Sequence, residues 1–223
     1  MEDKNEYNIV VADSHPVVIQ GLVSLFKETS NFNISGVAHS GKDLRILLEQ
    51  NLKIDTIFID LKLPNTNIYR LIKDLVVAHS YAKIIAFTNY TMPKLVQDIM
   101  EFGVHAYLSK NATLPEILES IERVHNGEHF ISNSVYRKDS QSKIEDNDFA
   151  LTPEENFVKF AELTERELDV VILLSRGYTN KEIAEKLFLS KYTIETHRKN
   201  IMKKCKLRTV GQLIYLATQQ GLL

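Results

Sequence analysis

The stretch that decides the fold of the C-terminal part of the chain is residues 179–204, TNKEIAEKLFLSKYTIETHRKNIMKK. Thr179 and Glu182 have the spacing of a capping box, in which each side chain satisfies a free backbone N–H of the other residue at a helix start. Apolar residues then recur at helical spacing on both sides of a turn at residues 188–190. We therefore predict two helices joined by a tight turn, each with an inner face. The inner positions are Ile183, Ala184, Leu187, Ile194, His197, Ile201 and Cys205.

The outer face of the second predicted helix carries cations and hydrogen-bonding groups, which suit phosphates and base edges. A solvated charged face on an ordinary amphipathic helix is the alternative interpretation. If the helix binds double-stranded DNA, we expect Glu195, Thr196 and Lys199 to reach base edges in the major groove. The candidate DNA contacts are Asn180, Lys181, Lys191, Thr193, Glu195, Thr196, Arg198, Lys199 and Lys203.

Together with Gly177 and LTERE at residues 163–167, this string resembles the LuxR-type helix-turn-helix family over about residues 160–223. The shared pattern is Leu-Thr-x-Arg-Glu, then Asn-Lys-Glu-Ile-Ala, then Ser-x-x-Thr-Val-x-x-His, with Ile194 here in the place of Val. The resemblance implies a small all-α, four-helix DNA-binding domain. Lys206 follows a cysteine where the family often has Leu-Gly, and a lysine at a left-handed helix stop would be strained. Because one such module reads few base pairs, we expect a homodimer on promoter DNA.

Length and charge divide the chain in two. Its 223 residues are enough for two ordinary domains. Residues 160–223 hold 11 lysines and arginines against 7 acidic residues, a net charge of +4, whereas residues 1–159 hold 16 against 22, a net charge of −6. The basic part thus coincides with the predicted DNA-binding part. The single cysteine excludes an internal disulfide. Without a signal peptide or a membrane span, we expect a cytoplasmic protein.

In the first 126 residues, short apolar strands alternate with helical patterns five times. This alternation predicts an α/β fold with a doubly wound, five-stranded parallel sheet that is covered on both faces. We place the strands at residues 8–12, 34–38, 56–60, 83–88 and 106–108. The helices lie between them, and the last runs from residue 114 to residue 125.

Polar side chains mark the carboxyl ends of four of these strands: Asp13, Asp60, Thr88 and Lys110. Each one alone is more often a turn residue or a solvated cation. In a parallel sheet, however, the strand ends meet at one edge, which is where such sheets bind ligands. Two carboxylates with a lysine and a threonine nearby could hold Mg²⁺ and accept a phosphoryl group.

This part of the chain, about residues 7–126, resembles the flavodoxin-like receiver domain of bacterial two-component response regulators, here of the NarL/FixJ-like kind. The resemblance implies that a sensor histidine kinase phosphorylates Asp60, and that Asp13 and Asp60 are the metal ligands for Mg²⁺. It also implies switch and phosphate-binding roles for Thr88, Tyr107 and Lys110. The whole chain would then be a transcription factor that is not itself an enzyme.

The sequence departs from the receiver pattern at three places. Ser14 stands where the family usually has a second aspartate, which predicts weak Mg²⁺ binding. Residues 65–68, NTNI, replace a glycine-containing loop. The side chain of Lys62, two residues after Asp60, could place a positive charge near the site. The alternative is therefore an atypical receiver that regulates transcription without phosphate.

We divide the chain into a receiver domain at residues 1–126, a linker at residues 127–159 and the helix-turn-helix domain at residues 160–223. Residues 152–160 begin with a pattern typical of a first helical turn. Two other functions compete with this interpretation. An Mg²⁺-dependent phosphatase would need an acid-base partner at Lys62, and a signalling adaptor without DNA binding would not need the basic outer face.

Overall fold

The computed structural model describes the chain except for residues 1–6, 30, 51–52, 65, 137–162 and 220–223. The chain forms two compact units, residues 1–146 and 147–223, so the division falls inside the predicted linker. The predicted first turn of a helix at residues 152–160 lies outside the described residues.

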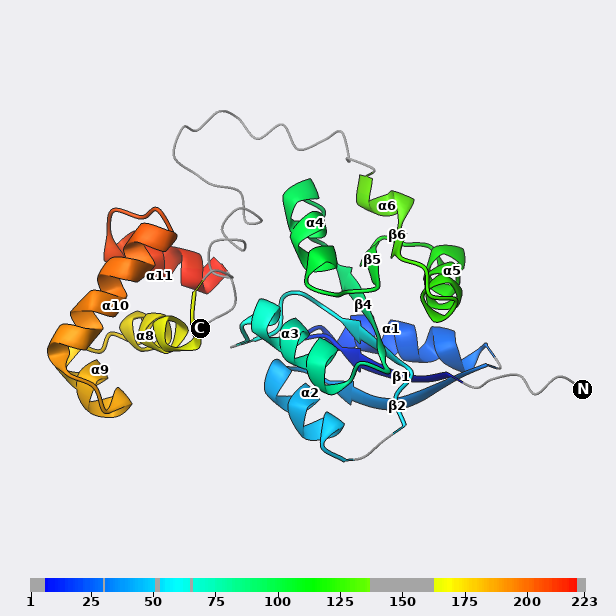
Figure 1. Cartoon of the computed structure of the whole chain (residues 1–223), viewed down its shortest axis with the longest axis horizontal. Helices are drawn as coiled ribbons and strands as arrows, with labels where there is room; N and C mark the ends of the chain where they lie inside the picture. The colour runs from blue at the N-terminus through cyan, green and yellow to red at the C-terminus, as the bar shows by residue number, and fades with distance from the viewer. Residues whose placement is uncertain (1–6, 30, 51–52, 65, 137–162, 220–223) are drawn as a thin grey trace, which may run out of the picture. The chain divides into compact units, whose positions relative to one another are not determined.

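The first unit is built on a parallel sheet with the order β2-β1-β3-β4-β5-β6 (Figure 1). All five strand pairs are parallel. This confirms the doubly wound α/β fold, with one strand more than the five predicted. The strands are β1 (Tyr7–Ala12), β2 (Phe32–Ala38), β3 (Thr56–Ile59), β4 (Lys83–Thr88), β5 (Ala106–Ser109) and β6 (Phe130–Ile131).

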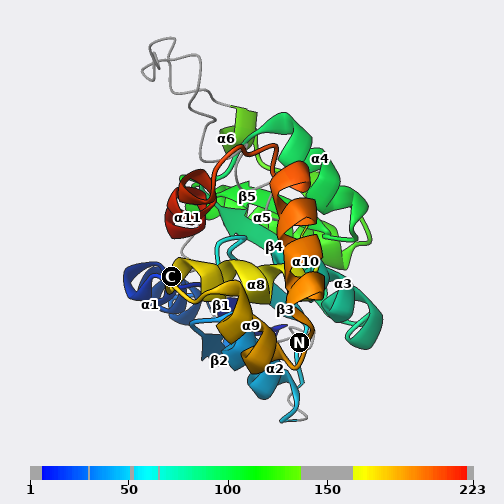
Figure 2. The same cartoon turned by 90° about the vertical axis from the view of Figure 1, so that its left-hand side faces the viewer.

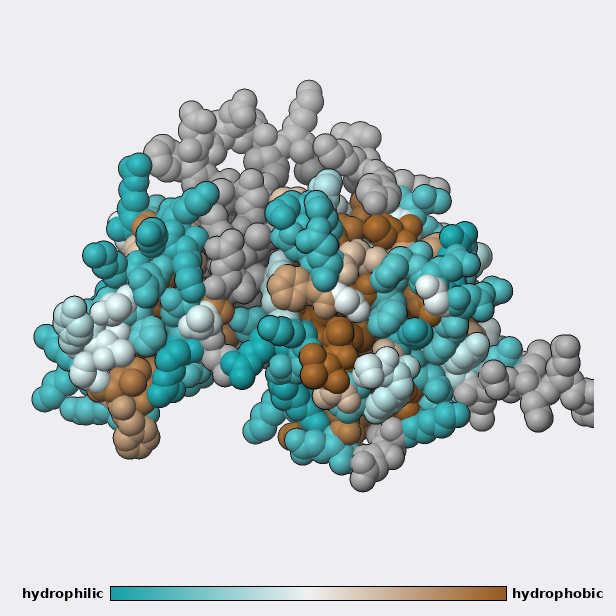
Figure 3. All heavy atoms as spheres, viewed as in Figure 1, coloured by the Kyte–Doolittle hydropathy of each residue, from teal (hydrophilic) through white to brown (hydrophobic). Residues whose placement is uncertain are grey.

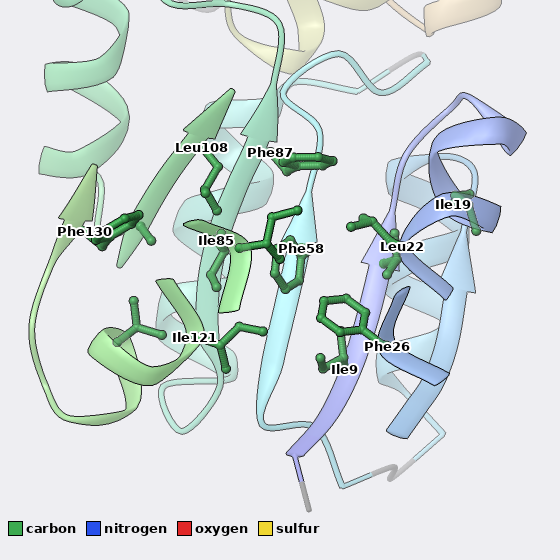
Figure 4. Packing of buried hydrophobic residues seen from close by; sticks show 14 residues of the cluster. Ile9, Ile19, Leu22, Phe26, Phe58, Ile85, Phe87, Leu108, Ile121 and Phe130 are labelled. Atoms are coloured by element: carbon green, nitrogen blue, oxygen red, sulfur yellow. The ribbon is translucent and has the colours of Figure 1, made fainter. Parts of the chain in front are cut away.

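Helices cover both faces of this sheet, because successive side chains of a strand point to opposite faces. One face packs on α1 and α5 through a cluster that includes Phe26, Phe58 and Ile121 (Figure 4). The alternate positions of the same strands, such as Ile57 and Ile84, are equally buried on the other face. The helices are α1 (Pro16–Lys27), α2 (Gly41–Leu48), α3 (Ile68–Ala78), α4 (Pro93–Glu101), α5 (Leu114–His125) and α6 (Asn133–Tyr136).

The sixth strand and α6 come from the first residues of the predicted linker. β6 pairs with β5 through Phe130 opposite Ala106. Beyond β6, the buried hydroxyl of Ser132 donates a 2.6 Å hydrogen bond to Glu116 of α5. That hydrogen bond, with further ones from Thr113, lowers the pKa of Glu116 to about 2. The folded part of the first unit therefore extends beyond residue 126, into the first residues of the predicted linker.

The second unit is all-α, as predicted. Its described helices are α8 (Glu165–Ser175), α9 (Asn180–Leu187), α10 (Lys191–Lys204) and α11 (Val210–Gln219). Figure 2 looks onto this unit, with α10 running along one side of α8 and α9. One core joins all four helices and includes Val170, Ile183, Ile201 and Leu213. Among the residues that the structure describes, no helix is both long and apolar enough to cross a membrane.

Two histidines lie half-buried at the edge of the sheet opposite to the strand ends described above. Nδ1 of His105 accepts a 3.1 Å hydrogen bond from the N–H of Ile84, so this nitrogen carries no proton. Burial, with the nearby charges of Lys83 and His129, lowers the pKa of His105 from 6.5 to about 4. Burial also lowers the pKa of His125. Both imidazoles are therefore neutral in the native state at pH 7.

Acid should destabilise the first unit through His105. The unfolded chain takes up a proton near pH 6.5, whereas the native imidazole takes one up only near pH 4. Stability is therefore present above pH 6.5 and is lost as the pH falls toward 4, by about 1–2 kcal/mol after discounting for the exposed part of the ring. Calorimetry between pH 7 and 4.5 on the native protein and on His105→Asn, whose amide keeps an acceptor for Ile84, measures this term. Equal losses in both proteins would contradict the prediction.

Candidate functional site

The carboxyl edge of the sheet brings together side chains that are up to 97 residues apart in the sequence. Asp13 directly follows β1, Asp60 follows β3 and Lys110 follows β5. The residues that precede the two aspartates, such as Val11, Ala12 and Ile59, are apolar and buried, so the first charged side chains follow where these strands end. The parallel order then places these ends at one edge, as predicted.

Lys110 joins the two aspartates directly. Its Nζ lies 2.6 Å from Oδ2 of Asp13 and 2.7 Å from Oδ2 of Asp60. The aspartate side chains are only 2% and 3% exposed, and that of Lys110 is 9% exposed. A lysine and two carboxylates leave this pocket with one uncompensated negative charge. Removing Lys110 would leave two buried carboxylates side by side without a cation, which is costly.

His15 also belongs to this pocket, although no role was predicted for it from the sequence. It precedes α1, and both its backbone N–H and its ring Nδ1 lie within hydrogen-bonding distance of Oδ1 of Asp13, at 2.8 and 2.9 Å. The same Nδ1 is 4.0 Å from Oδ2 of Asp60. Ser14 instead directs its hydroxyl toward the carbonyl of Lys62, at a long 3.4 Å. The only signal in the sequence was a histidine two residues after a strand-end aspartate.

Thr88 and Tyr107 are both fully buried on the strands that flank the pocket. Thr88 ends β4, and its carbonyl accepts a 2.9 Å hydrogen bond from the backbone N–H of Lys110. Tyr107 lies on β5 and donates a 2.7 Å hydrogen bond from its hydroxyl to the carbonyl of Tyr90. The aromatic ring is thus turned inward in this structure.

The loop after Asp60 is held although it lacks the glycine of the receiver pattern. The hydroxyl of Thr66 accepts a 3.2 Å hydrogen bond from the N–H of Gly41, the first residue of α2, and donates one of 2.7 Å to the carbonyl of Pro64. A Cβ on Gly41 would come within 2.5 Å of Thr66. The backbone N–H of Lys62 donates to Oδ1 of Asp60 at 3.2 Å, so this lysine contacts the site through its backbone.

The pocket has the donor atoms to hold a divalent cation. One atom each from Asp13, His15 and Asp60 lies within 4.8 Å of the other two. Two carboxylates are ligands of the kind that Mg²⁺ prefers, whereas an imidazole suits transition metals better. Asp13 and Asp60, the predicted metal ligands, are therefore joined by a nitrogen donor that was not predicted.

In the second unit, most of the predicted DNA contacts are exposed, and the face seen in Figure 3 is mainly hydrophilic. Glu195, Thr196 and Lys199 all lie on the exposed side of α10, opposite to the buried Ile194 and Ile201. The other exposed contacts are Lys181, Lys191 and Lys203, while Asn180, Thr193 and Arg198 are partly buried.

Two of the partly buried residues join α9 and α10 by a hydrogen bond between their side chains. Arg198 of α10 donates a hydrogen bond to the side chain of Asn180 at the start of α9. Both were predicted to contact DNA, and in this structure they contact each other. Thr193 is similarly engaged with Ser190, the N-cap of α10, whose Oγ lies 2.8 Å from the hydroxyl of Thr193.

Two further braces were not predicted, because they join residues far apart in the sequence. Lys204 of α10 donates a 2.7 Å hydrogen bond to the buried carboxylate of Glu167 in α8. Burial acts to raise the pKa of Glu167, but the hydrogen bonds from Lys204 and Thr164 hold it below its ordinary value. Arg166 donates to the carbonyl of Leu187 at the end of α9, at 2.6 Å. The three helices around the turn are thus tied pairwise.

Both helices of the motif stop at a residue in the left-handed conformation. Phe188 ends α9 with φ +54°, and Lys206 follows α10 with φ +52°. After α10, the N–H of Leu207 bonds to the carbonyl of Met202, which is the pattern of a Schellman cap. The expected strain at Lys206 is confirmed, since a residue with a Cβ is disfavoured there.

Comparison with known proteins finds a family for each of the two units. The model of the response regulator receiver domain matches residues 9–122, about half of the chain, and the model of the bacterial regulatory proteins of the luxR family matches residues 161–217. The chain therefore belongs to the response regulators, with a receiver domain followed by a LuxR-type DNA-binding domain, and its function is transcriptional regulation.

Several relatives match along nearly their whole length. The uncharacterized transcriptional regulatory protein YhcZ of Bacillus subtilis is 31% identical over 214 residues, which are 96% of each chain. The response regulator UvrY of Escherichia coli is 27% identical over 215 residues, covering 96% of this chain and 95% of its own. Among solved structures, RcsB of Salmonella typhimurium covers 96% of this chain and 98% of its own with a TM-score of 0.56 at 22% identity, which shows the shared fold.

Relief of the strain at Lys206 should stabilise the second unit. Lys206→Gly should raise its free energy of unfolding by roughly 0.5–1 kcal/mol, because glycine adopts φ +52° without a steric cost. The matched control is Lys203→Gly, which should cost about 1 kcal/mol because position 203 is helical. Hydrogen exchange of peptides from residues 163–219 in the full chain measures both. The two variants changing stability in the same direction would disprove the strain at residue 206.

Proposed function

We propose that this response regulator is phosphorylated on Asp60 by a sensor histidine kinase, and that the phosphoryl group controls DNA binding by its helix-turn-helix domain. The observation that carries the proposal is the buried contact of Lys110 with both Asp13 and Asp60. This contact holds the carboxylate of Asp60 in place beside an ammonium group, and that group could pair with an incoming phosphoryl oxygen.

In the proposed reaction, a carboxylate oxygen of Asp60 forms a bond to phosphorus while the bond from phosphorus to a histidine nitrogen of the kinase breaks. The kinase histidine leaves with the electron pair. Lys110 then shifts its charge from the two carboxylates to the new phosphoryl group. A bound divalent cation would neutralise further phosphoryl charge. Thr88 would donate its hydroxyl to the phosphoryl oxygen, which would draw the end of β4 toward the pocket.

The alternative is that this receiver works without phosphate, and two observations favour it. Tyr107 is already buried, with its hydroxyl bonded to the carbonyl of Tyr90, whereas a phosphate-driven switch would move this ring inward. Ser14 adds no carboxylate to the pocket. If most unphosphorylated molecules already have the Tyr107 ring turned inward, phosphorylation can shift the population of that state only slightly.

For the second unit, we propose that it binds promoter DNA as a homodimer through the exposed side of α10. The exposed position of Glu195, Thr196 and Lys199 supports major-groove contacts. Solved structures include an RcsB–DNA complex and two RcsB dimers bound to two parallel DNAs. Two half-sites would supply the specificity that one module lacks.

Phosphorylation should depend on Asp60 and should respond to Ser14. Asp60→Asn should abolish modification by a small phosphodonor, measured by intact mass. Ser14→Asp should tighten Mg²⁺ by roughly tenfold through the added carboxylate charge and should speed modification. The matched control is Asp74→Asn, an exposed aspartate paired with Arg45, which should leave modification unchanged. Unmodified native protein under conditions that modify Ser14→Asp would favour the phosphate-independent alternative.

Substitutions on α10 should distinguish the side chains that contact bases from those that contact phosphates. Lys199→Ala should cost roughly 1–3 kcal/mol on the cognate site and relax sequence preference. Lys203→Ala should instead weaken all sequences similarly and lower the salt slope by about 1. Titrations on cognate and random DNA at several salt concentrations distinguish the two, and sedimentation of the complexes counts the protein copies. An equal loss for Lys199→Ala on both DNAs would refute its assignment, and one copy per site would refute the dimer.

A further inference from the structure

The exposed side of α10 begins with an aromatic ring that was not among the predicted DNA contacts. Tyr192, the second residue of the helix, is 79% exposed. Glu195, Thr196 and Lys199 follow it by three, four and seven positions, so these side chains lie on the same side of the helix as the ring. Thr196 stands one turn beyond Tyr192 and is its direct neighbour there. The first two turns of α10 thus present a ring and a threonine next to each other.

The hydroxyl of Thr196 is engaged within the helix. It donates a 3.0 Å hydrogen bond to the backbone carbonyl of Tyr192. A threonine hydroxyl has one hydrogen to donate, so this exposed side chain keeps its acceptor lone pairs and its methyl group for a partner. Together, Tyr192 and Thr196 therefore offer an apolar surface, which lies beside the charged side chains of Glu195 and Lys199.

The major groove of DNA contains one apolar group that fits such a surface. Each base pair presents hydrogen-bond donors and acceptors there, and among the four bases only thymine adds a methyl group, at C5. In helix-turn-helix proteins, the first residues of the recognition helix contact base edges. Tyr192 occupies that part of α10. A contact between its ring and a thymine methyl group would remove apolar surface from water, which is favourable.

We propose that Tyr192 and Thr196 read thymine methyl groups in the major groove, and that Tyr192 is therefore a residue that determines which DNA sequence is selected. The inference rests on the proposed function, since it concerns DNA binding by the same exposed side of α10. It also assigns the base contact of Thr196 to its methyl group, because the hydroxyl hydrogen is already donated to the helix backbone.

A contact with the phosphate backbone is the other use of an exposed tyrosine at a helix start. Its hydroxyl would then donate to a phosphate oxygen, and the contact would carry no sequence information. The position of Thr196 favours the base contact, because its methyl group continues the apolar surface along the helix, where a phosphate would need donors. Tyr192→Phe separates the two uses, since it removes the hydroxyl and keeps the ring.

The test begins with DNA sites that the full chain selects from random sequences, with and without a small phosphodonor. Each thymine of a selected site is then replaced by deoxyuracil, which lacks only the methyl group. At one or two thymines per half-site, this replacement should weaken binding roughly fourfold, which corresponds to the burial of one methyl group. Tyr192→Ala should abolish the loss at one of these thymines, and Tyr192→Phe should keep it. Thr196→Ser, which retains the hydroxyl, should abolish the loss at the same or the adjacent thymine.

Lys203→Ala is the matched control on the same helix. It should weaken binding to every site and leave the ratio between thymine and uracil sites as it is in the native protein. A uracil loss that is as large in Tyr192→Ala as in the native protein, or no uracil loss at any thymine, would overturn the proposal. A uniform loss of affinity in Tyr192→Phe would assign Tyr192 to a phosphate and would overturn it as well. DNA binding would stand in all these cases, whereas a chain that selects no site would refute the proposed function itself.

Discussion

The buried contact of one ammonium group with two carboxylates is the interaction on which the first unit depends for its chemistry. Lys110 holds Asp13 and Asp60 at 2.6 and 2.7 Å, at the end of three apolar strands. In such a cluster, the cost of removing charges from water offsets much of the attraction between them. The cluster is therefore poor evidence for a gain in folding stability. Its importance is chemical instead, because it keeps charged groups close together at a place where a bound ligand can change which of them are paired.

Two of the three departures from the receiver pattern are each accompanied by a contact from a neighbouring residue. Ser14 brings no charge, and the neighbouring His15 turns its ring toward Asp13. The loop after Asp60 has no glycine, and Thr66 holds it to the start of α2 through the backbone of Gly41. The pocket is thus complete as a set of contacts, although its charge and its donor atoms differ from those of an all-carboxylate site.

In the second unit, polar contacts between side chains fix the orientation of one helix, α10. The four helices described for this unit share one apolar core, but a core of this kind leaves helix angles adjustable. The hydrogen bonds of Lys204 with Glu167 and of Arg198 with Asn180 tie α10 to α8 and to α9. They hold the exposed side of α10, with Glu195 and Lys199, in one orientation.

Local patterns in the sequence determined the elements and the fold class. Strands such as β4 and the helix α5 lie at the predicted residues, because their apolar periods and capping signals act over a few neighbouring positions. β6 escaped prediction because two residues are too short to show a period, and only the exposed edge of β5 made them a strand.

The sequence by itself determined the two domain types, the strand-end residues and the basic outer face of α10. Only the tertiary structure decided that His15 joins the pocket, that Arg198 contacts Asn180, and that Tyr107 is turned inward. The physical reason is that a side chain chooses its contacts among groups that other strands and helices bring near. Those neighbours can be tens of residues away in the sequence, as Lys204 is from Glu167.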